Sequence, residues 1–336
     1  MKKVLSIFLM LIALSCRVYA SDVSLHVASD LGNLGEVKSL LENGVNVDTL
    51  NSSKETPLYL ASKAGHTRIV KLLLEHGANP NAKKYCGKTP LIAACKYKYI
   101  NTAKLLLKYG ANVNDILNEN ITPLFEACCG YDAAMDANFN LVKLLLDHGA
   151  DADPQPLKNG ATPLSKAVEN ISYKTAILLL EHGAKPNNDT CENMPILNYL
   201  CNSIYTPEEY EAEKLRLIEA LLQHGADVDY FSKCYATPLF LACRCNNIDV
   251  VKLLLEYGAN VNIPVYTDIP GYTEITPLQI ARKNNNTEIV ELLLEYGACE
   301  QQQNQHELGN VVKPDTECPF FKIYNSYPCE DLMKAF

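Results

Sequence analysis

An internal repeat of about 33 residues constrains this chain more than any other feature of its sequence. Successive glycines that close each unit are most often 33 residues apart. A sequence with such a period forms a stack of similar units, because no single unit can bury its apolar face alone. The repeated Thr-Pro pair ends at Pro57, Pro90, Pro123, Pro163, Pro238 and Pro277, with Pro195 in a degenerate copy, and the closing glycines are Gly44, Gly77, Gly110, Gly149, Gly183, Gly225, Gly258 and Gly297.

Each unit reads as two short helices followed by a polar turn. In the second unit, Thr56 can cap a helix and Pro57 can occupy its first position, where the missing N–H costs nothing. Gly65 interrupts the pattern, and the apolar residues of 69–74 then recur at helical spacing. Gly77 supplies the left-handed residue that ends the second helix. The sequence therefore predicts a helix-turn-helix unit joined to the next by a polar finger.

This pattern resembles the ankyrin repeat, in which a β-turn and two helices carry the motif T-P-L-H-x-A. The motif appears here as TPLYLA, TPLIAA, TPLFEA, TPLSKA, TPLFLA and TPLQIA. The resemblance covers residues 22–300 and implies an all-α solenoid of about eight repeats. The first unit lacks Thr-Pro, as expected of a terminal repeat.

Three units are longer than the others. The fourth has extra residues around 130–138, which we place in the turn between its helices. In the sixth, Thr206 and Pro207 followed by two glutamates predict a second helix lengthened to about 207–223. In the eighth, the finger at 263–274 is longer, apolar and tyrosine-rich, which favours a contact role. Neutral drift is the alternative reading, since lengthening a loop costs little.

The two ends of the chain differ in composition from the repeats. Residues 1–20 combine Lys2 and Lys3 with an apolar stretch and small residues before Ser21, which is typical of a secretory signal peptide. Cys16 offers an alternative, a lipid anchor after a weak lipobox. We therefore divide the chain into a signal peptide (1–20), a repeat domain (21–300) and a tail (301–336) that caps the last repeat or docks elsewhere.

The sequence carries no sign of catalysis or cofactor binding. No Walker loop, GxSxG, GxGxxG or HExxH motif and no zinc spacing occurs. Four histidines precede closing glycines, yet tyrosine takes the same place in three other units. A slot that accepts either ring is best explained as a half-buried helix end beside the terminal carbonyls. We expect no enzyme activity, no cofactor and no metal site.

Three groups of cysteines bear on the prediction. Cys86, Cys191 and Cys234 share a finger-tip position, and the last two belong to neighbouring units, so they are an alternative pair for a disulfide. The cysteines of the first helices, at 95, 128 and 243, replace an alanine of the motif and are expected to fill the core. Cys318 and Cys329 lie in the tail and form the favoured candidate for a disulfide, if any forms.

The resemblance implies binding of a protein through the fingers and the exposed side of the first helices. The net charge of −9 repels polyanions, so nucleic acid is not expected as a partner. Lysines and tyrosines along the predicted surface favour an acidic or loop-rich protein partner, and we expect the chain to be a monomer. The expected contact residues are Tyr85, Lys88, Lys96, Tyr97, Lys158, Lys233, Tyr235, Arg244, Tyr266 and Tyr272.

The sequence leaves both the compartment and the role of the protein open. The signal predicts an exported protein, either periplasmic or secreted. The high content of Asn, Lys, Ile and Tyr suggests an AT-rich genome, as in a host-associated bacterium whose ankyrin proteins act on host targets. The alternatives are a structural or protective periplasmic protein, and an inhibitor or enzyme-associated module that acts through the tail.

Overall fold

The computed structural model describes residues 24–84, 87–130, 135–190, 194–202, 210–231, 236–266 and 274–299. The predicted signal peptide, Cys16, the tail and its two cysteines lie outside these residues. The chain divides into two compact units. The N-terminal unit comprises residues 1–127 with 147–150, and the C-terminal unit comprises 128–146 with 151–336.

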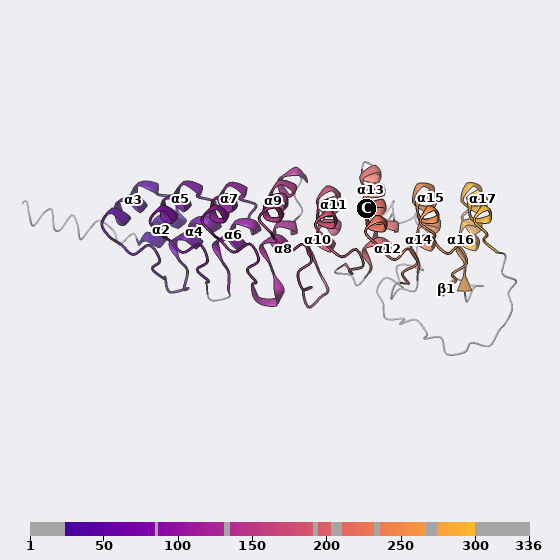
Figure 1. Ribbon diagram of the computed structural model, residues 1–336, viewed down its shortest axis with the longest axis horizontal. Coiled ribbons are helices and arrows are strands. Elements are labelled where there is room, and N and C mark those ends of the chain that lie inside the picture. The colour runs from indigo at the N-terminus through magenta and orange to yellow at the C-terminus, as the bar shows by residue number, and fades with distance from the viewer. Residues whose placement is uncertain are drawn as a thin grey trace, which may run out of the picture. The chain divides into compact units, whose positions relative to one another are not determined.

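The N-terminal unit consists of stacked helix pairs, which confirms the predicted all-α repeat architecture. The first helices α2, α4 and α6 form one row, the second helices α3, α5 and α7 form another, and the fingers extend from the first row (Figure 1). The helices are α2 (Leu25–Asp30), α3 (Leu34–Glu42), α4 (Pro57–Ala64), α5 (Thr67–Glu75), α6 (Pro90–Lys96), α7 (Ile100–Lys108), a 3-10 turn η1 (Asn118–Asn120) and α8 (Pro123–Cys128), whose last residue belongs to the other unit.

The C-terminal unit follows the same plan. Helices α12, α14 and α16 pack against one another in sequence, and α11, α13, α15 and α17 form the second row. The elements are α9 (Met135–Asp147), α10 (Pro163–Glu169), α11 (Tyr173–Glu181), α12 (Ile196–Cys201), α13 (Glu211–Gln223), α14 (Pro238–Arg244), α15 (Ile248–Glu256), β1 (Val265–Tyr266), β2 (Glu274–Ile275), α16 (Pro277–Lys283) and α17 (Thr287–Glu295).

The first helices begin as the Thr-Pro motif predicts. Thr56 Oγ1 accepts a hydrogen bond of 3.1 Å from the backbone N–H of Tyr59, and Pro57 occupies the first helical turn. Each such cap contributes about 1 kcal/mol. The degenerate copy differs, because Pro195 lies at the cap position and α12 begins one residue later. The same Thr cap is made at Thr89, Thr122, Thr162, Thr237 and Thr276.

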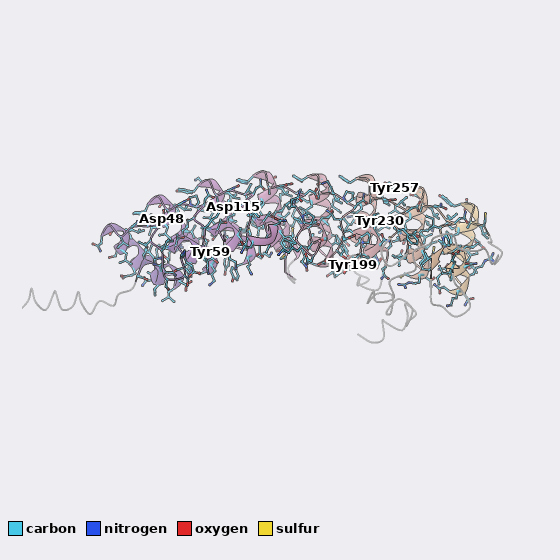
Figure 2. All side chains as sticks on the ribbon, turned by 90° about the horizontal axis from the view of Figure 1, so that it is seen from below. Asp48, Tyr59, Asp115, Tyr199, Tyr230 and Tyr257 are labelled. Carbon is cyan, nitrogen blue, oxygen red and sulfur yellow. The ribbon has the colours of Figure 1, made fainter. Side chains whose placement is uncertain are left out.

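A ladder of side chains at the start of each finger joins neighbouring repeats. Asp48 accepts from the N–H of Asn79 at 3.1 Å (Figure 2). Asn81 does the same for Asn112 at 2.8 Å and also donates to the carbonyl of Gly110 at 3.0 Å, a second bond that the carboxylate of Asp48 cannot make. The ladder continues at Asn114, Asp153, Asn187, Asp229 and Asn262.

The turn between the two helices of a repeat requires one residue with positive φ. Gly65 fills this place in the second repeat at φ +77°, and the ring of Tyr99 lies directly over its α-carbon. In the C-terminal unit the β-branched Ile171 adopts φ +57° at the equivalent place, where Asn246 and Asn285 stand in other repeats. A β-branched residue is strained in this region, whereas asparagine tolerates it.

The insertions depart in part from their predicted form. Helix α9 begins at Met135 and has 13 residues, so part of the fourth-unit insertion lengthens the second helix instead of lying wholly in the turn. Helix α13 ends at Gln223 as predicted but begins at Glu211, and Pro207 lies outside the described residues. In the eighth unit β1 pairs with β2 in an antiparallel hairpin, and Val265 and Ile275 are fully buried. The apolar character of this finger therefore serves packing as well as any contact.

The histidines before the closing glycines accompany helix ends, but they are exposed where half-burial was predicted. The Nδ1 atoms of His76, His182 and His224 lie 2.8–2.9 Å from carbonyl oxygens of the last helical turn. A ring that hydrogen-bonds a terminal carbonyl need not be buried to do so. The cysteines at 95, 128 and 243 are buried in the core, as predicted.

One buried charge was not anticipated. The side chain of Lys214 in α13 is fully buried, and its Nζ lies 2.7 Å from a carboxylate oxygen of Glu211. Burial of an ammonium group requires such a partner. No helix in the described part of the chain is both long and apolar enough to cross a membrane.

Candidate functional site

Three of the predicted contact residues come together in the N-terminal unit. Lys88, Lys96 and Tyr97 line one hollow of about 150 Å³, which we call the finger-side hollow. It is formed by the finger 79–88 together with α4, α6 and α8. The other lining residues are Tyr59, Lys63, Lys84, Ile92, Ala93 and Glu126.

The repeat sequence explains why these side chains meet. Tyr59 and Ile92 occupy the same place in successive copies of the motif, two residues after the proline. Lys63 and Lys96 stand at the same place in the last turn of α4 and α6. Because adjacent repeats stack in register, equivalent residues become neighbours on one face.

The floor of the hollow is apolar and rigid. Tyr59 and Ala93 are buried and pack together with Leu60, and Ile92 is buried beside them. Tyr59, labelled in Figure 2, thus places an aromatic ring on the floor, where the next repeat has the aliphatic Ile92.

Lys84 is fixed above this ring. Its Nζ lies 5.4 Å from the centroid of Tyr59 and 2.5 Å from Oε1 of Glu55. Burial alone would raise the pKa of Glu55. The hydrogen bonds from Lys84 and Asn51, with the positive charges of Lys84 and Lys63, outweigh burial and hold that pKa below 4.5. The pair is therefore ionised at neutral pH, and Lys84 is positioned for a structural role at the rim.

Adjacent lysines of one finger bind opposite neighbours. Lys84 reaches back to Glu55 of the preceding finger, and Lys83 reaches forward to Asp115, with Nζ 3.1 Å from Oδ1. The carboxylates of both pairs are largely buried, so solvent screens them less than it screens surface pairs. These two ion pairs hold three successive fingers in a defined register beside the hollow.

The remaining lysines of the hollow keep their charge available. Within the described residues, Lys63, Lys88 and Lys96 form no ion pair at 4.0 Å or less. Glu126 is the one acidic residue of the lining that the structure describes. An anionic group in the hollow would meet a local excess of positive charge in a chain that is acidic overall.

Tyr97 forms the aromatic wall of the hollow. It is 45% exposed and stacks on Tyr99, with the ring centroids 6.2 Å apart and the rings inclined by 27°. Stacked aromatic rings contribute about 0.5–1.5 kcal/mol beyond their buried area. Since Tyr99 lies over Gly65, this wall is anchored on the turn of the preceding repeat.

Among the described residues, none of the other predicted contact residues lines this hollow. In the C-terminal unit, Lys158 is exposed on a finger. Arg244 was expected to present its charge to a partner, but it is half-buried and its Nη2 donates to Oδ1 of Asn202 at 3.2 Å, because it packs at the end of α14 against the neighbouring repeat. Tyr85, Lys233, Tyr235 and Tyr272 lie outside the described residues, and only the backbone of Tyr266 is described, in β1.

The prediction missed Tyr59, Lys84 and Glu126. Tyr59 stands where the family motif T-P-L-H-x-A has histidine, which was a usable signal. Lys84 had none, because its position over Tyr59 depends on a contact between residues 25 positions apart. In the described part of the chain no cluster of three or more His, Cys, Asp or Glu side chains could hold a metal ion.

Comparison with known proteins agrees with this architecture. The family model for ankyrin repeats in three copies matches residues 25–117, 114–190 and 210–265, and the model for a single ankyrin repeat matches 273–305. Similar proteins include the ankyrin repeat protein FPV230 of fowlpox virus, 31% identical over 157 residues, and an ankyrin repeat protein of Rickettsia bellii, 33% identical over 125 residues. The mouse homolog of B-cell lymphoma 3 protein is 33% identical over 111 residues.

These matches cover different shares of each protein. They span 40%, 37% and 33% of this chain, and 84%, 35% and 23% of the fowlpox, Rickettsia and mouse proteins respectively. Ankyrin repeats are in general non-catalytic modules for protein–protein interaction. The family models together cover most of the repeat domain, and the chain therefore belongs to the ankyrin-repeat family.

Proposed function

We propose that this protein binds an acidic segment of a protein partner at the finger-side hollow. The observation that carries the proposal is a set of three lysines, Lys63, Lys88 and Lys96, that form no ion pair with the described residues and surround an apolar floor and the exposed ring of Tyr97. A carboxylate entering the hollow gains charge-assisted hydrogen bonds from lysine. Its aliphatic neighbours gain contact with Tyr97, a residue type that is enriched at interfaces.

The size of the hollow favours a protein over a small molecule. Pockets for drug-sized ligands usually have volumes of about 300–1,000 Å³, whereas this hollow encloses about 150 Å³. It accommodates one or two side chains. Binding must then extend over the neighbouring fingers and first helices, as in a protein interface of about 800 Å² per partner.

A charge reversal tests this proposal. Proteins captured by the chain from Ser21 onward are identified by mass spectrometry, and the purified leading candidate is titrated against the chain and against K88E/K96E. We expect the variant to weaken binding at least tenfold, with the affinity of the parent chain falling as salt is added. The matched control is K174E/K252E, which makes the same change of net charge on exposed second-helix residues of the C-terminal unit. Equal binding by the parent chain and K88E/K96E would refute the proposal.

We also propose that the chain is exported, to the periplasm or into a host, where the partner resides. The support is the composition of residues 1–20. Mass spectrometry of the protein purified from its producing cell distinguishes cleavage before Ser21 from lipidation at Cys16. An intact N-terminal Met1 on the mature protein would contradict export by either route.

A further inference from the structure

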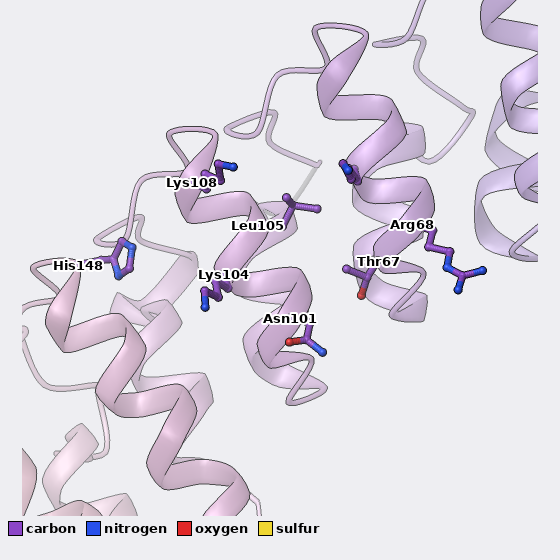
Figure 3. Close-up of a pocket in the computed structure, with 8 residues that line it drawn as sticks. Thr67, Arg68, Asn101, Lys104, Leu105, Lys108 and His148 are labelled. Atoms are coloured by element: carbon purple, nitrogen blue, oxygen red, sulfur yellow. The ribbon is translucent and has the colours of Figure 1, made fainter.

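A second hollow lies on the opposite side of the repeats from the fingers, over the second helices of the N-terminal unit. It is a groove of about 540 Å³ across α5 and α7. Leu105 lies between the two helices, with Asn101 and Lys108 toward the two ends of α7 (Figure 3). The half-buried Leu105 and the aliphatic stems of the surrounding side chains make the surface of the groove mainly apolar.

Four exposed cations surround this apolar centre. Arg68 and Lys71 belong to α5, and Lys104 and Lys108 belong to α7. The lining that the structure describes contains no acidic residue. Lys71 alone among the four has an ion pair with described residues, a 3.7 Å contact with Glu75 on its own helix, which is weak at an exposed site.

The fold itself does not require these charges. Helices α15 and α17 form the equivalent pair in the C-terminal unit and have the same length. Acidic residues occupy three of the four equivalent places there, and the fourth is Lys252, whose Nζ lies 3.2 Å from Oε1 of Glu288 on α17. The three acids are Asp249, Glu291 and Glu295, in the places of Arg68, Lys104 and Lys108.

The like-charge spacing of these cations opposes helix stability, although Lys108 in the last turn of α7 gains from the helix dipole. Lys104 and Lys108 are four residues apart on α7, and Arg68 and Lys71 are three apart on α5. Like charges at these spacings destabilise a helix by a few tenths of a kcal/mol per pair. The last place of the second helix is occupied by an acid or glutamine in every other repeat, so Lys108 departs from the pattern of this chain.

From this charge pattern we infer that the α5–α7 groove is a second docking site, which takes an acidic, amphipathic segment of a protein partner. Its carboxylates pair with the four cations while apolar side chains cover Leu105. This chemistry suits such a segment better than nucleic acid, because a phosphodiester chain has no apolar side for the groove and is repelled by the net charge of −9. The site lies apart from the finger-side hollow, so the inference does not depend on the function proposed above.

The test uses the full chain with the finger-side hollow disabled by K88E/K96E, so that only the groove contributes. The probe is a fluorescein-labelled peptide of Glu-Glu-Leu-Leu repeats, and the readout is its fluorescence anisotropy. We expect saturable, salt-sensitive binding that falls at least tenfold in K104E/K108E. The charge-matched control K174E/K252E should bind the peptide as the background does. K104Q/K108Q, which introduces no negative charge, should show a smaller loss of peptide affinity. It replaces K104E/K108E in the test if that variant unfolds.

Two results would overturn the inference. The first is peptide binding that the changes at Lys104 and Lys108 leave unaltered, or no binding in the K88E/K96E background. The second is tighter binding of duplex DNA or of phosphatidylglycerol vesicles than of the peptide, lost in the same variants. Neither result bears on the finger-side hollow, whose own test uses Lys88 and Lys96.

Discussion

The contact between Gly65 and Tyr99 allows a sharp prediction, because the chain supplies its own control. A β-carbon added at Gly65 would lie 2.7 Å from two carbon atoms of the Tyr99 ring. Gly77 has a similar backbone, at φ +84° against +77°, but nothing lies within 4 Å of the same added atom. Gly65→Ala and Gly77→Ala therefore differ mainly in the collision with the ring.

The expected losses of stability follow from two contributions, the left-handed backbone and the collision with the ring. Alanine in the left-handed region costs about 1–2 kcal/mol, of which reduced freedom of the unfolded chain returns about 0.4–1 kcal/mol. Gly77→Ala should thus lower the free energy of unfolding by about 1 kcal/mol. Gly65→Ala must also displace a ring that stacks on Tyr97, and overpacking of this kind costs about 1–3 kcal/mol more.

Urea denaturation followed by circular dichroism measures both variants, and hydrogen exchange with mass spectrometry localises the loss. Repeat arrays can unfold locally, so Gly65→Ala should raise exchange in α4 and α6 more than elsewhere. In a Tyr99→Ala background the collision is absent, and Gly65→Ala should then cost no more than Gly77→Ala. Equal losses of stability in the two single variants would refute the reasoning.

Other consequences of the structure can be checked with single changes. Ile171→Asn should stabilise the protein by about 0.5–1 kcal/mol in urea titrations, because asparagine tolerates the positive φ that strains isoleucine; a loss of stability would show that packing of the isoleucine outweighs its strain. Asn81→Ala should cost about 1–2 kcal/mol in the same assay, since it removes two hydrogen bonds to the next repeat, and an unchanged midpoint would contradict the ladder. The ion pair of Glu55 stabilises the protein fully at pH values above 4.5, the ordinary pKa of this carboxyl group. The stabilisation is lost as the pH falls through the lowered pKa of Glu55 in the folded protein. The difference in melting temperature between the parent chain and Lys84→Met should therefore narrow in acid, and a difference that widened below pH 4.5 would reverse the assigned direction. Cys299 is exposed, whereas burial raises the pKa of the thiols at 201 and 243, so peptide mapping after alkylation of the folded protein should find Cys299 modified and those two protected.

Much of the fold could be predicted from short stretches of sequence. Thr56 and Pro57 begin a helix, and Gly77 follows the end of the next, through contacts within a few residues, so the repeat boundaries could be read directly. The insertions were predicted less well. Residues such as Met135 suit either a turn or an extra helical turn, and local propensity does not decide between them.

The candidate site could be predicted only in part. Lys96 and Tyr97 were expected at the surface because they follow the buried stretch of a first helix. Arg244 has the same place in its own repeat but is half-buried against Asn202, a difference that the residue type and position do not reveal. Exposure at equivalent places depends on the neighbouring repeat, not on the repeat itself.

By itself, the sequence determined the repeated helix pair, its caps and its family, because these depend on signals that recur within 33 residues. The tertiary structure decided which charges act together. Through stacking of repeats, Lys84 lies over Tyr59 and beside Glu55, and Lys71 and Lys104 line the same groove. Each of these contacts joins side chains of two different repeats. The repeat pattern within one unit does not specify which side chains of neighbouring repeats will come together.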